Sequence, residues 1–163
     1  MAIREEFTAE QWQLLLDIPT AVGTAVMVAG ASGIGSMKEA LVLASATLTA
    51  QGKFAGCELV EALLDARVKG GQRSNFESLN SPYRGMSPEE ILEDVLVMCG
   101  EVSRLLQAKV GEEVAGEFKS WVIDVGTRVA AAAKEGGFLG LGGERISSEE
   151  RKVLSAVKEA LGL

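Results

Sequence analysis

The side chains that could serve as acids, bases or metal ligands in this chain are carboxylates and two thiols, because the sequence contains no histidine. Without imidazole, Ser-His and Cys-His nucleophilic catalysis is excluded and the commonest metal ligand is missing. Asp17 and Asp124 could exchange protons with a substrate if they formed a buried pair. Capping and surface roles are far commoner for such residues, and we expect those roles here.

Four more carboxylates surround the last glycine-rich segment, namely Glu135, Glu144, Glu149 and Glu150. Hard cations bind oxygen ligands of this kind, but the spacing is not that of a calcium-binding loop. We therefore interpret these residues as charges at helix ends, and we expect no metal ion and no cofactor.

The two cysteines, Cys57 and Cys99, lie in apolar helical patterns and share no C-x-x-C spacing. This arrangement predicts buried, reduced thiols rather than a disulfide framework. Residues 1–7 carry two acidic side chains where a signal peptide needs positive charge followed by an apolar run. A cytoplasmic protein is the expectation.

Two glycine-rich segments are the other candidates for chemistry, since backbone amides at the start of a helix can bind phosphate. The first, residues 30–35, has the spacing G-x-x-G-x-G instead of G-x-G-x-x-G, and a helical pattern follows where a dinucleotide-binding fold needs its second strand. The second, residues 136–143, is more apolar than an ordinary surface loop. We interpret both segments as connections between helices. Their candidate interface residues are Gly33, Ile34, Gly136, Gly137, Phe138, Leu139 and Leu141. Phe138, Leu139 and Leu141 either fill the core, which is the preferred interpretation, or form the patch that contacts a partner.

The elements that position these segments all have helical periodicity, so the sequence predicts an all-α bundle of six or seven helices in a single domain, residues 1–163. Helix-start patterns occur at residues 8–11, 36–39, 87–90 and 147–150. We expect the first helix to break or kink near Pro19, with Asp17 able to cap the part that restarts. Helices are also expected at about 37–50, 54–69, 88–110, 112–135 and 148–161. Residues 70–86 are polar and predict a long surface connection.

Residues 18–37 contain no charged side chain, and about 20 such residues could span a bilayer. Pro19, several threonines and glycines, and the lack of leucine and aromatic residues keep this stretch less apolar than a lipid-facing helix. We expect a buried central helix instead. Ala21, Ala25 and Ala29 recur at four-residue spacing and predict a face against which another helix packs closely.

An internal similarity links the two glycine-rich regions. The sequence V-G-T-A-V at 22–26 resembles V-G-T-R-V at 125–129, and each is followed by a glycine segment and a serine-capped helix. In those helices Ser36 and Glu39 match Ser147 and Glu150. The pattern predicts two similar helix, glycine loop and helix units related by a pseudo-twofold axis.

The run A-K-E-G-G-F-L-G-L-G-G at 133–143, followed by I-S-x-x-E at 146–150, resembles a signature of an uncharacterised bacterial family of helical proteins. That resemblance implies no activity. The last thirty or so residues are also similar to TerB-like tellurite-resistance domains, whose turn carries Asp-Gly and whose acidic residues have been linked to metal binding. Here the glycine-rich apolar segment replaces that Asp-Gly, which puts the metal ligand itself in doubt.

A formal net charge of −7 opposes binding to nucleic acid, which needs clustered Lys and Arg. Hydrophobic residues make up 47% of the chain but aromatic residues only 5%, which favours tightly packed helices over an aromatic-lined pocket. The leading hypothesis is a non-catalytic helical interaction or structural protein that forms a homo-oligomer, a dimer in the simplest case. One alternative is a peripheral membrane protein that inserts Phe138, Leu139 and Leu141, although no basic cluster supports it. Another is a TerB-like stress protein that binds a metal or a phosphorylated small molecule.

Overall fold

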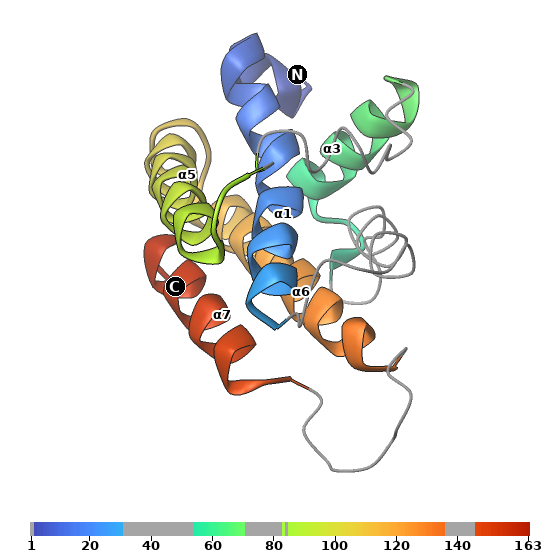
Figure 1. The fold of residues 1–163 in the computed structure, drawn as a ribbon. Helices are drawn as coiled ribbons and strands as arrows, with labels where there is room; N and C mark the ends of the chain where they lie inside the picture. Colours follow the sequence, from blue (N-terminus) through green and yellow to red (C-terminus); the bar gives the residue numbers. More distant parts are fainter. Residues whose placement is uncertain (1, 31–53, 71–82, 84, 136–145) are drawn as a thin grey trace.

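The computed structural model describes residues 2–30, 54–70, 83, 85–135 and 146–163 (Figure 1). For residues 132–135 it describes the backbone alone. A short 3-10 helix, η1 (Ile3–Glu6), precedes the α-helices. These are α1 (Ala9–Gly30), α3 (Glu58–Lys69), α5 (Pro88–Lys109), α6 (Glu112–Glu135) and α7 (Ser148–Ala160). The described residues contain no strand, which confirms the all-α class. The helix expected at 37–50 and most of the connection expected at 70–86 lie outside these residues.

Helix α1 is the centre of the bundle, with α5, α6 and α7 packed around it and α3 against its first half (Figure 1). Every residue from Ile18 to Val28 is buried, so this part of the helix is enclosed on all sides, as expected for a core helix. Its length and composition would also suit a membrane span, but 72% of its most apolar window is buried by the rest of the chain. Ala21 and Ala25 are buried as predicted, and Ala29 is half-buried.

Of the break or kink predicted near Pro19, the break is wrong, because α1 continues through this residue to Gly30. Asp17 caps no restarting helix, and its Oδ1 accepts a hydrogen bond from the Gln13 side chain, 2.8 Å away. An interior proline removes one helical hydrogen bond and disfavours the helix by about 3 kcal/mol. Burial of apolar side chains on both sides of Pro19 outweighs that penalty.

Three of the four predicted helix starts lie in the described residues and form the expected capping pairs, whereas the start expected at 36–39 lies outside them. In the first, Gln11 N donates to Thr8 Oγ1 at 3.2 Å and Thr8 N donates to the Gln11 side chain at 3.0 Å. The same reciprocal pair joins Ser87 to Glu90 at the start of α5, and α7 begins in the same way. Each pair satisfies two backbone amides that a helix start leaves without partners.

Helix α3 is shorter than predicted. It begins at Glu58 instead of Phe54, with Cys57 as the residue before the first turn. Gly56 has φ +91°, a left-handed backbone that an α-helix cannot contain. Phe54 is nevertheless buried, so the turn before α3 still contributes to the core.

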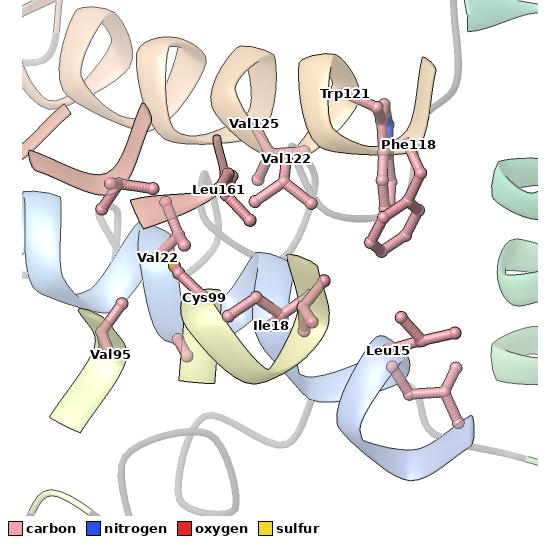
Figure 2. Close-up of a cluster of buried hydrophobic side chains, with 14 of the residues drawn as sticks. Leu15, Ile18, Val22, Val95, Cys99, Phe118, Trp121, Val122, Val125 and Leu161 are labelled. Atoms are coloured by element: carbon pink, nitrogen blue, oxygen red, sulfur yellow. The ribbon is translucent and has the colours of Figure 1, made fainter. Parts of the chain in front are cut away.

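The core lies between α1, α5 and α6 and is closed by α7 (Figure 2). Phe118 and Trp121 are its largest fully buried side chains, with ring centroids 5.9 Å apart. Where α6 crosses α1, Gly126 lies against Val22 and Val26, and a Cβ atom at Gly126 would stand 2.9 Å from Leu154 of α7. A glycine is therefore what lets three helices meet at this point.

Candidate functional site

The candidate interface residues of the two glycine-rich segments lie outside the described residues: Gly33, Ile34, Gly136, Gly137, Phe138, Leu139 and Leu141. Their flanks are described. Gly30 ends α1 and is the first residue of the first segment, Glu135 ends α6 just before the second, and Ile146 and Ser147 lead from the second into α7. The positions of these flanking residues show where the fold holds the ends of the two glycine-rich segments.

The structure brings the flanks of both segments together through Glu150. This side chain is only 2% exposed, and its Oε2 accepts a hydrogen bond from Ser147 N at 2.8 Å. Its carboxylate and Cγ lie over the backbone of Gly30, and a Cβ atom at Gly30 would stand 2.6 Å from Glu150 Cδ. The C-terminal end of α1 and the N-terminal end of α7 therefore meet at a buried carboxylate.

Glu150 was expected to be a charge at a helix end, and its role in the cap of α7 agrees with that expectation. Its burial was not predicted. Its position in the first turn of α7 is favourable for an acidic side chain, because a helix N-terminus carries partial positive charge. Glu149 is exposed and pairs with Lys152 at 3.0 Å, so the two neighbouring glutamates have different roles. Glu144 and the side chain of Glu135 lie outside the part described.

A second buried charge, Arg67 of α3, reaches α1 beside Pro19. Its Nη2 donates hydrogen bonds to the carbonyl of Leu16 and to Thr20 Oγ1. Burial lowers the pKa of Arg67, and the nearby charge of Asp17 opposes that shift. Sequence reasoning missed this contact, since Arg67 occupies a position of the α3 pattern that looks like an ordinary basic residue near a helix end.

Asp17 and Asp124 take part in separate local contacts. Burial raises the pKa of Asp17, against the opposing effects of the Gln13 hydrogen bond and the Arg67 charge. Asp124 lies 2.8 Å from the guanidinium of Arg128, one turn further along α6. Asp17 therefore interacts with Gln13 and Arg67, whereas Asp124 interacts with Arg128.

A third buried charge lies at the opposite end of α7. Lys119 of α6 donates to Ser103 Oγ at 3.0 Å, and Ser103 of α5 donates to the carbonyl of Leu161 at 3.1 Å. Gly162 has φ +75° and closes α7 by donating to the carbonyl of Glu159. A cation beside the last carbonyls of a helix is favourable, so Lys119 and Ser103 hold the end of α7 against two other helices.

Both cysteines are buried thiols that form no disulfide, as predicted. Burial raises the pKa of Cys99 to about 12. Burial and the neighbouring Glu117 carboxylate raise the pKa of Cys57. Thiolate is the nucleophilic form of cysteine, so neither thiol is activated for nucleophilic attack at neutral pH.

Within the described ranges, no three side chains among His, Cys, Asp and Glu converge in a way that could hold a metal ion. The chain matches no family model, no curated protein and no solved structure. The resemblances to the bacterial helical family and to TerB-like domains therefore stay predictions.

Proposed function

We propose that this protein is a non-catalytic helical interaction module that assembles as a homodimer through the apolar glycine segment at 136–143. The observation that carries the proposal is the contact of Glu150 with Gly30, which brings the flanks of both glycine-rich segments to one end of the bundle. Under the proposal, apolar residues of both segments form one patch that is larger than either segment alone would provide. A twofold dimer needs such a patch because the same surface is used by both copies.

The buried polar side chains support a structural role. Among the described residues they are Thr20, Thr24, Arg67, Lys119 and Glu150. Each takes part in hydrogen bonds that lead to the backbone of a helix or of its cap, directly or through one other side chain. Buried charged side chains that bind helix backbone stabilise one arrangement of the helices. In a catalytic centre, such side chains would face a substrate instead.

We also propose that the chain consists of two related helical units. The support is that the matching motifs, 22–26 in α1 and 125–129 in α6, lie beside each other. Gly126 lies against Val22, and Met27 packs with Val129. The two helices run in broadly the same direction (Figure 1). Thr24 and Thr127 of the two motifs each donate to the carbonyl four residues earlier, at 2.8 and 2.9 Å. A twofold axis that lies between α1 and α6, roughly parallel to both helices, would produce this arrangement.

The interface is tested with a double variant, Phe138→Ser with Leu141→Ser, and its molar mass measured by light scattering after size exclusion. The matched control is Val97→Ser on α5, where an apolar side chain that is 61% exposed is likewise replaced by serine. Wild type and control are expected at the mass of a dimer, and the double variant at the mass of one chain. An unchanged dimer in the double variant would place the interface elsewhere.

Co-sedimentation with anionic phospholipid vesicles separates the proposal from membrane-surface binding. Under the proposal, wild-type protein stays in the supernatant with and without vesicles. Pelleting of wild type that is lost in the Phe138→Ser, Leu141→Ser variant would assign the same residues to a lipid surface instead.

A further inference from the structure

We draw no further inference here: the strongest candidate, the Lys119–Ser103 side-chain cluster buried where the end of α7 meets α5 and α6, is already accounted for as the contact that holds the carbonyl of Leu161.

Discussion

The carboxylate of Glu150 lies so close to Gly30 that a methyl group at position 30 would overlap with Glu150 Oε1 and stand 2.8 Å from its Cγ. The two residues are 120 positions apart in the chain. Their contact joins the end of the central helix to the start of the last one, and it is the relationship on which the proposed interface depends.

Replacing Gly30 with alanine is expected to destabilise the protein by about 1–3 kcal/mol, because Glu150 must move and give up its hydrogen bond to Ser147. The free energy of unfolding in urea measures the effect. In a Glu150→Ala background the same substitution should be much less destabilising, since the overlapping side chain is gone. Equal effects in both backgrounds would contradict the contact. Gly100→Ala is a suitable control, because nothing lies within 4 Å of a Cβ atom at that position of α5.

Replacing Gly126 with alanine tests the crossing of α1, α6 and α7. The new methyl group would meet Leu154 Cδ2 at 2.9 Å and Val22 Cγ1 at 3.1 Å, so we expect a loss of about 1–3 kcal/mol in unfolding free energy. Gly116→Ala on the same helix has open space around the new Cβ atom and should stabilise by roughly 0.5–1 kcal/mol through helix propensity. Chemical denaturation of the two variants side by side gives the comparison, and effects of the same sign would refute the close crossing.

Arg67→Met keeps much of the apolar stem of the side chain but removes the donor to the Leu16 carbonyl and Thr20. We expect a loss of about 1–3 kcal/mol, the usual range when a buried hydrogen-bonding group loses its partner. Arg67→Lys should restore only part of it, because an ammonium group lacks the fork of donors that guanidinium presents. The exposed Arg104→Met should change stability by less than about 0.5 kcal/mol. A neutral Arg67→Met would show that the contact beside Pro19 contributes nothing.

The helix starts were predictable because their signals are local. The capping pairs of Thr8, Ser87 and Ser147 depend on residues three positions apart, and all three form the expected hydrogen bonds. The burial of Cys99 also followed from the helical pattern around it. Cys57 is buried as predicted, but it lies before the first turn of α3 instead of inside a helix. Local features of this kind can be predicted without knowing how the helices pack against one another.

The failures have a common cause, which is that they depend on tertiary contacts or on backbone conformation. Pro19 signals a break locally, but burial of the surrounding helix keeps α1 continuous. The φ of Gly56 shortens α3 at its start, and no spacing rule gives that angle. Arg67 and Glu150 look like ordinary surface charges in the sequence, and only the packing of α3 on α1 and of α7 on α1 buries them.

Stability should fall as the pH rises from about 9 towards 12, because burial raises the pKa of Cys99 from its ordinary value of 9.0 to about 12. In this window the unfolded chain loses the thiol proton while the folded chain keeps it, so each pH unit removes up to about 1.4 kcal/mol. Below pH 9 the Cys99 thiol keeps its proton in both the folded and the unfolded chain, so its contribution to the free energy of unfolding is fully present. Urea unfolding at pH 8, 9 and 10 measures the slope for wild type and Cys99→Ala. The variant should show a shallower decline, and parallel slopes would contradict the shifted pKa.

The most direct test of the proposed function is the molar mass of the wild-type protein in solution, measured by light scattering over a range of concentrations. The proposal predicts twice the 17.1 kDa mass of one chain, approached as the concentration rises. A constant mass of one chain throughout, up to the highest soluble concentration, would contradict the homodimer and with it the role proposed for residues 136–143.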